Sequence, residues 1–179
     1  MHAPEEGAAA ARRAVGATNG GSQVSECDHL IVRQAIEALN AAFAWDVDHR
    51  WGEGVPELFV EDGVYAAPGL ELRGRGEIAR FYAERRARGK RTSRHVFTNL
   101  HLFEVRPGSA RGTTLLTLHA HDGEGPLPAS PSAVMDYEDE YVRGADGQWR
   151  YVRRNVVPVF GEVPKLVAQQ NQKPVGGDQ

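Results

Sequence analysis

The chain has 179 residues, of which 41% are hydrophobic, and it carries a formal net charge of −3 at pH 7. This length suits one domain with a hydrophobic core, and the charge excludes a general attraction to nucleic acid or to anionic membranes. The single cysteine, Cys27, excludes an internal disulfide and a cysteine-rich metal cluster, so we expect a cytoplasmic protein. No apolar run approaches the roughly 20 residues that cross a bilayer.

The two ends of the sequence differ in composition from its middle. Residues 1–26 are rich in Ala, Gly and Glu, and residues 161–179 contain prolines and glutamines without sustained periodicity. Both segments are predicted to be disordered tails, because they lack the apolar residues that would anchor them to a core. The folded domain is therefore expected over residues 27–160.

Helical periodicity dominates the first part of this domain. Five apolar residues recur at helical spacing: Val32, Ile36, Leu39, Phe43 and Val47. Asp28, which precedes them, is the candidate N-cap of this first helix. A short second helix is expected over residues 55–60, a hairpin over residues 64–73 around Pro68-Gly69, and a third helix over residues 76–88.

Four long strands are predicted after the helices, at about residues 94–105, 113–121, 133–142 and 149–159. The turns between them are marked by Pro107-Gly108, by a Gly/Pro-rich loop over residues 122–131 and by Asp146-Gly147. Long consecutive strands curl as they twist, and helices cover the concave side. The predicted fold is α+β: a cone-shaped half-barrel whose curved, mostly antiparallel sheet is covered by three N-terminal helices.

A histidine and a carboxylate form the main candidate for chemistry. His95 begins the first long strand, where alternation places it on one face with Phe97 and Asn99. Asp48 stands near the end of the first helix, beside small residues that leave space. An imidazole with a carboxylate is the smallest set of groups that moves protons near neutral pH. We predict that the fold brings His95 together with Asp48, in preference to the more exposed Asp46.

Several segments resemble one family of α+β half-barrels. They are residues 48–51, 57–65, 93–96 with Asn99, 137–141 and 147–150. Together they resemble the SnoaL-like group of the nuclear-transport-factor-two-like superfamily over residues 28–160. That group includes polyketide cyclases, scytalone dehydratase, steroid Δ-isomerases and the β subunits of ring-hydroxylating dioxygenases.

The resemblance implies roles for individual residues. Asp48 matches the acidic position of the first helix, and His95 matches the strand histidine that pairs with it, so these two are the expected catalytic residues. Tyr65 falls where scytalone dehydratase has a pocket tyrosine that holds a catalytic water. Val47 departs from that pattern, because the dehydratase has another water-binding tyrosine there, and this puts dehydration of the same substrate in doubt. The expected substrate-binding residues are Trp45, Tyr65, Phe97, Asn99 and His119.

An Asp-His pair suits proton abstraction next to a carbonyl, followed by proton return, loss of water or ring closure. We therefore predict a dehydratase, cyclase or isomerase for a small cyclic, aromatic or polyketide-like molecule, a chemistry that requires no metal or organic cofactor. One alternative is a non-catalytic ligand-binding or assembly module similar to a dioxygenase β subunit. Another is an epoxide-opening hydrolase or cyclase that uses carboxylates and arginines among Asp136, Asp139, Arg153 and Arg154. A metal site at His119, His121 and Asp122 lacks a further spaced ligand, with only His101 as a candidate.

Two surface features are predicted, a basic run and an apolar sheet face. Five cations gather near the end of the third helix, at Arg85, Arg86, Arg88, Lys90 and Arg91. We interpret this run as the solvated end of that helix. An apolar sheet face that contains Val96, Leu100, Leu116 and Leu118 is predicted to contact a second subunit, which favours a homodimer, with a trimer as the alternative.

Overall fold

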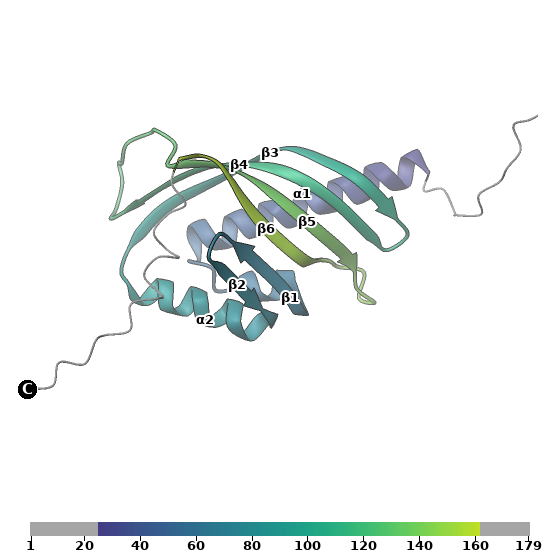
Figure 1. Ribbon diagram of the computed structural model, residues 1–179, viewed down its shortest axis with the longest axis horizontal. Coiled ribbons are helices and arrows are strands. Elements are labelled where there is room, and N and C mark those ends of the chain that lie inside the picture. Colours follow the sequence, from purple (N-terminus) through teal and green to yellow (C-terminus); the bar gives the residue numbers. More distant parts are fainter. Residues whose placement is uncertain (1–24, 162–179) are drawn as a thin grey trace, which may run out of the picture.

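A computed structural model describes residues 25–161 (Figure 1). The predicted tails, apart from their inner ends, lie outside the described residues. No helix in the described part is both long enough and apolar enough to span a membrane. The elements, in chain order, are α1 (Glu26–His49), the 3₁₀ helix η1 (Val55–Leu58), β1 (Phe59–Ala67), β2 (Leu70–Arg73), α2 (Gly74–Ala87), β3 (Arg91–Arg106), β4 (Ser109–Asp122), β5 (Ala133–Arg143) and β6 (Trp149–Gly161).

One curved sheet forms the body of the domain. Its strand order is β2-β1-β6-β5-β4-β3, and all neighbours are antiparallel except β1 and β6. Helix α1 lies across one face of the sheet, and α2 lies beside the β1–β2 hairpin (Figure 1). The predicted α+β half-barrel with a mostly antiparallel sheet is confirmed.

The number of α-helices in residues 25–161 is two, because the predicted second helix is only a 3₁₀ turn over Val55–Leu58. Phe59, expected inside that helix, instead begins β1 and pairs with Tyr151 of β6. Its side chain is fully buried, with the ring 5.0 Å from that of Tyr151. Burial against the sheet therefore overrides the local helical pattern. The N-cap of α1 is Ser25, whose Oγ accepts a hydrogen bond from the backbone N–H of Asp28.

The hydrophobic core lies between α1 and the concave face of the sheet. The helix contributes Ile36, Leu39, Phe43 and Val47, all less than 8% exposed, which follows the predicted spacing. The sheet contributes inward-facing residues of every second position, as a pleated strand requires.

The predicted apolar outer face is wrong for three of its four residues. Leu100, Leu116 and Leu118 are buried in the core, and only Val96 is exposed. Leu100 changes face because β3 has an irregular register between Thr98 and His101, where Asn99 adopts a φ of +54°. Such a bulge shifts the alternation of the strand by one residue. The homodimer remains a prediction that this face does not support.

Gly52 lets the chain leave α1 in contact with α2, and we expect alanine to be poorly tolerated there. Its φ is +78°, and a Cβ would lie 2.0 Å from a ring carbon of Tyr82. Gly108 has a matching φ of +80° but no atom within 4 Å of that position. Left-handed strain together with overpacking should make Gly52→Ala cost about 2–5 kcal/mol of unfolding free energy, against about 1–2 kcal/mol for Gly108→Ala. Urea denaturation measures both losses, and equal values would contradict the steric argument.

Candidate active site

The carboxylate of Asp48 and the ring of His95 are in direct contact. His95 Nδ1 lies 2.6 Å from Asp48 Oδ1, and both side chains are less than 10% exposed. The backbone N–H of His95 donates to Asp48 Oδ2 at 2.8 Å, and Ser93 Oγ donates to Oδ1 at 2.7 Å. Asp48 thus receives donors at both of its oxygens, and the orientation of the imidazole is fixed.

The local structure explains why these groups meet. Asp48 is the penultimate residue of α1, which crosses the sheet and ends beside the start of β3. β3 is one of the two edge strands, so the side of its backbone that faces away from β4 is available to a side-chain acceptor. Ser93 and His95 are two residues apart on that strand and therefore point to the same side. The role of Ser93 as a second donor was not predicted from the sequence.

The ionised form of Asp48 is favoured. Burial opposes the charge, but hydrogen bonds from His95 and Ser93 and the charge interaction with His95 outweigh it and lower the pKa of Asp48 below 3.8. With an ionised carboxylate at Nδ1, that nitrogen carries the proton. The lone pair on Nε2, which has no hydrogen-bond partner among the described side chains, then makes His95 a base.

This lowered pKa predicts a pH dependence of stability. Because the pKa of Asp48 is lower in the folded chain than the ordinary value of 3.8, the ionised carboxylate stabilises the fold at pH values above 3.8. This stabilisation is lost as the pH falls through the pKa of the folded chain. The stability advantage of the parent chain over Asp48→Asn should therefore shrink as pH falls below about 4. Urea denaturation across this range measures it, with exposed Asp62→Asn as the control. A difference that stays unchanged at low pH would contradict the assignment.

Asp46, expected to be the more exposed aspartate, is buried and has a structural role. Its Oδ1 accepts the backbone N–H of Gly54 at 2.8 Å, and its Oδ2 pairs with Arg50 at 3.3 Å. Two residues along a helix correspond to a turn of about 200°, so Asp46 and Asp48 face nearly opposite directions. Asp46 therefore organises the end of α1, away from His95.

His95 lies between two hollows. The first is a partly open cavity of ≈ 60 Å³ inside the half-barrel, whose lining includes His95 and aromatic residues such as Tyr65, Phe81, Tyr82 and Tyr137. Burial raises the pKa of the Tyr65, Tyr82 and Tyr137 hydroxyls, so all three remain protonated at neutral pH and retain hydrogens to donate. Tyr65 and Tyr137 also share a hydrogen bond. Of the five predicted substrate-binding residues, only Tyr65 lines this cavity.

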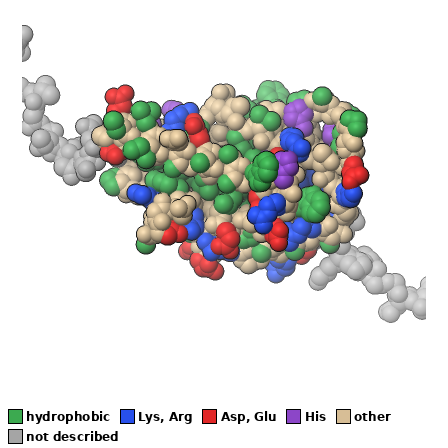
Figure 2. All heavy atoms as spheres, turned by 180° about the vertical axis from the view of Figure 1, so that it is seen from behind, with side chains coloured by type: hydrophobic (Ala, Val, Ile, Leu, Met, Phe, Trp, Pro, Cys, Tyr) green, Lys and Arg blue, Asp and Glu red, His purple; other side chains and the backbone are tan. Residues whose placement is uncertain are grey.

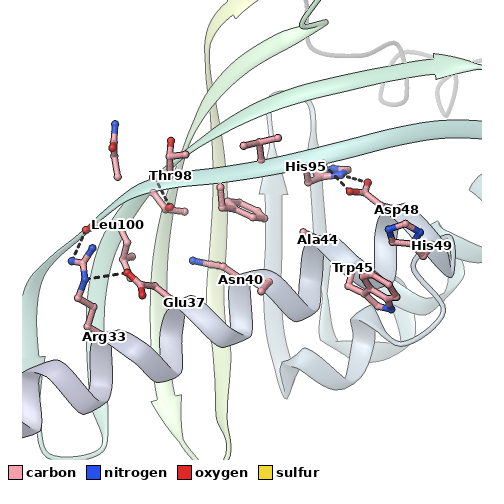
Figure 3. A pocket seen from close by; sticks show the side chains of 15 residues that line it. Arg33, Glu37, Asn40, Ala44, Trp45, Asp48, His49, His95, Thr98 and Leu100 are labelled. Atoms are coloured by element: carbon pink, nitrogen blue, oxygen red, sulfur yellow. Dashed lines mark hydrogen bonds and ion pairs between the residues drawn. The ribbon is translucent and has the colours of Figure 1, made fainter. Parts of the chain in front are cut away.

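The second hollow is an open groove of ≈ 580 Å³ between α1 and β3, which Figure 3 shows from close by. Asp48, Trp45, Phe97 and Asn99 line it. Trp45 is 63% exposed and lies against the His49 ring at 4.2 Å, so it forms the rim. Phe97 packs edge-on against Tyr137, which lines the cavity. Four of the five predicted substrate-binding residues are therefore divided between two hollows that meet at His95.

His119 lies in neither hollow, which corrects its predicted place. His95 pairs with Leu118 across β3 and β4, and Arg94 pairs with His119. Paired residues of neighbouring strands share a face, so His119 points to the convex side while His95 points to the concave side. Among residues 25–161, no group of three or more His, Cys, Asp or Glu side chains is arranged to hold a metal ion.

The basic run contributes two residues to the cavity that sequence reasoning missed. Arg85 and Arg91 line it, and both also line an adjacent hollow of ≈ 190 Å³. Figure 2 shows histidine side chains mostly toward one end of the molecule, with basic side chains near them and also elsewhere on this face. The interpretation of this run as a solvated helix end is therefore wrong for Arg91, whose side chain is 19% exposed and belongs to β3. The helical spacing of apolar residues in α2 was the only signal in the sequence for the position of this run, and that spacing ends before Arg91.

The residues proposed for epoxide opening are not assembled into one site. Asp139 and Arg154 are fully buried partners, with Arg154 Nη2 2.7 Å from Asp139 Oδ2 and Nε 3.0 Å from Oδ1. Asp136 and Arg153 are partly exposed. On their strands each is an odd number of residues from its buried neighbour, Asp136 from Asp139 and Arg153 from Arg154, so both side chains point to the convex face. Neither buried residue lines the aromatic cavity, so two carboxylates and an arginine do not converge around a water site there.

Several solved structures have the same fold. A candidate scytalone dehydratase from Novosphingobium aromaticivorans is 23% identical with a TM-score of 0.64, and the match covers 74% of this chain and 87% of that one. ActVI-ORFA from Streptomyces coelicolor is 21% identical with a TM-score of 0.64, covering 73% and 98%. The β subunit of a candidate aromatic-ring-hydroxylating dioxygenase from N. aromaticivorans is 16% identical with a TM-score of 0.66, covering 78% and 96%. These identities establish a shared fold alone.

A comparison with curated protein sequences finds no match. The family comparison, in contrast, matches residues 28–155, which include both helices and the sheet through most of β6. It also includes the Asp48–His95 pair and every lining residue of the aromatic cavity except Val156. On this match, the chain belongs to the SnoaL-like domain family.

Proposed function

We propose that this protein is an acid–base enzyme, a dehydratase, cyclase or isomerase, that moves a proton on a small cyclic, aromatic or polyketide-like molecule. The observation that carries the proposal is the 2.6 Å contact between His95 Nδ1 and an Asp48 carboxylate that Ser93 and the His95 backbone hold in place. This arrangement fixes the tautomer and leaves Nε2 as the base. Because His95 lines both the aromatic cavity and the open groove of ≈ 580 Å³, a molecule bound in either hollow would lie beside His95.

In the proposed reaction, Nε2 of His95 removes a proton from the carbon next to a carbonyl group. Asp48 stabilises the imidazolium that forms, and a hydroxyl of Tyr65 or Tyr137 donates to the enolate oxygen. The raised pKa values of these tyrosines suit donation of a hydrogen bond. Return of the proton to another carbon gives isomerisation. Transfer of the proton from the His95 imidazolium to a leaving β-hydroxyl releases water and gives dehydration, and transfer to the oxygen of a second carbonyl that the enolate carbon attacks gives ring closure.

Membership of the SnoaL-like family and the fold shared with a candidate scytalone dehydratase support this class of chemistry. The position of Val47 argues against the water-assisted route that the resemblance to scytalone dehydratase implies. Val47 is 2% exposed and packed in the core, so it supplies no hydroxyl to hold a water. Direct proton transfer between substrate carbon and His95 is therefore the step that we propose.

Hydrogen–deuterium exchange tests the proposal whatever the product of the reaction is. Phenolic, polyketide-like, steroid and terpenoid compounds are screened by thermal shift, because a ligand of the native state raises the melting temperature. Each bound carbonyl compound is then incubated with the protein in D₂O, and mass spectrometry follows deuterium at the carbon next to the carbonyl. Enzyme-dependent exchange is the expected result. Bound compounds that never exchange would favour the ligand-binding or assembly alternative.

A further inference from the structure

We propose that the substrate carries a carboxylate, and that Arg85 and Arg91 bind it at the mouth of the aromatic cavity. The inference rests on the proposed function in one respect, the placement of the substrate in that cavity. It concerns recognition of the substrate and is independent of the proton-transfer step.

The two arginines connect the cavity to a vestibule. Arg85 and Arg91 line the aromatic cavity and also the adjacent hollow of ≈ 190 Å³, whose other residues are Val47, Trp51, Arg86, Gly89 and Lys90. The vestibule thus has four cationic side chains and, among the described residues, no carboxylate in its lining. Any ligand that occupies both the cavity and the vestibule would contact the two arginines that line both.

Both arginines have unused capacity to bind an anion. Arg91 Nε is buried without a hydrogen-bond partner among residues 25–161, while its Nη1 lies 3.2 Å from Oδ1 of the 88%-exposed Asp122. Arg85 belongs to no ion pair among the described side chains, although it comes from the last turn of α2 and is only partly exposed. A buried guanidinium N–H without an acceptor is costly, and a carboxylate oxygen would satisfy it.

The electrostatics of the site favour a negative ligand. Burial and the nearby charge of Arg85 lower the pKa of Arg91, and the pairing with Asp122 only partly opposes this. Two cations that repel one another in a partly dehydrated place are stabilised by an anion between them. The net charge of the whole chain is −3, so this positive site is a local feature.

The shape of the space suggests the rest of the ligand. The aromatic cavity of ≈ 60 Å³ is by itself smaller than the roughly 150 Å³ that holds a benzene molecule in a protein core, so a planar ring would need both the cavity and the vestibule of ≈ 190 Å³. A carboxylate on the arginines would orient that ring with respect to Nε2 of His95, which lines the same cavity. The inferred substrate class is therefore a cyclic or aromatic carboxylic acid of one or two rings.

Calorimetric titration of matched compounds tests the inference. Benzoate, salicylate and 2-naphthoate are compared with the corresponding carboxamides, which keep the shape and lose the charge. At least about tenfold tighter binding of one or more carboxylates is expected, and Arg85→Gln and Arg91→Gln should each remove most of that preference. Arg85→Gln is the first variant to measure, because it breaks no ion pair of the described residues. Circular dichroism checks that both variants are folded.

Arg88→Gln is the matched control, since it removes the same charge from the same basic run but Arg88 lines neither hollow. It should change carboxylate affinity less than about twofold. Equal binding of acids and amides, no binding of any acid, or an equal loss in Arg88→Gln would each overturn the inference. Carboxylate binding through the arginines without deuterium exchange would overturn the proposed function alone. Exchange into a keto acid that proceeds at the same rate in the parent chain and in both arginine variants would overturn this inference alone.

Discussion

Replacement of Asp48 by Asn should lower the rate of deuterium exchange or turnover by at least about 100-fold, as should His95→Ala. His95→Ala removes the base. Asp48→Asn removes the negative charge that stabilises the imidazolium, and the amide N–H₂ can donate to Nδ1, which would move the ring proton to Nε2. Exchange rates at the substrate carbon, measured at neutral pH with saturating compound, give the comparison.

His119→Ala is the control for this prediction. His119 has the same side chain as His95 and belongs to the neighbouring strand, but the register of β3 and β4 places it on the opposite face of the sheet. It should leave the exchange rate unchanged. Full activity in either Asp48→Asn or His95→Ala would contradict the acid–base mechanism, provided that circular dichroism shows a folded chain.

The buried pair of Asp139 and Arg154 gives the largest expected effect on stability. Asp139→Asn should lower the free energy of unfolding by about 3–5 kcal/mol, because it leaves the guanidinium without a compensating charge in the core. Arg154 also donates to Asn40 Oδ1 at 2.6 Å and lies 3.9 Å from the centre of the Tyr151 ring. Neither the amide oxygen of Asn40 nor the ring of Tyr151 carries the negative charge that compensates the guanidinium. Urea denaturation measures the loss, and a cost below about 1 kcal/mol would show that the pair is not tightly coupled.

Two further variants separate the charge effect from general disruption. Asp146→Asn breaks the Asp146–Arg150 pair in the β5–β6 turn, where Asp146 is half exposed, and should cost much less. The double variant Asp139→Leu with Arg154→Met removes both charges together and should recover part of the stability lost in Asp139→Asn. A double variant less stable than Asp139→Asn would indicate that packing around Arg154, including its contact with Phe43, dominates.

Local patterns predicted most of the fold. The helical spacing of Ile36, Leu39, Phe43 and Val47 identified the buried face of α1, and the four long strands were predicted within a few residues of their observed bounds. The error at Phe59 has a long-range cause, because its strand conformation depends on pairing with Tyr151, about 90 residues later. Periodicity reports what a segment does alone, whereas pairing with distant strands decides its final conformation.

The site depended more on contacts that no local pattern contains. The alternation of side-chain direction along β4 predicts that His119 and Leu118 lie on opposite faces of the sheet. Only the pairing of Leu118 with His95 shows which of the two lies on the concave face. The bulge at Asn99 then reversed the alternation and moved Leu100 into the core. A one-residue shift of register exchanges the two faces of a strand, so errors in register become errors in the site.

The sequence by itself determined the element types, the curved sheet and the two candidate groups, an aspartate at the end of a helix and a histidine at the start of a strand. Only the tertiary structure decided that Asp48 contacts His95, while Asp46 accepts a hydrogen bond from the backbone N–H of Gly54. It also placed Arg91 in the cavity wall, although the sequence pattern resembled a solvated helix end. The reason is physical: hydrophobic spacing is set by neighbours along the chain, whereas a site is set by the crossing of α1 over the edge of the sheet.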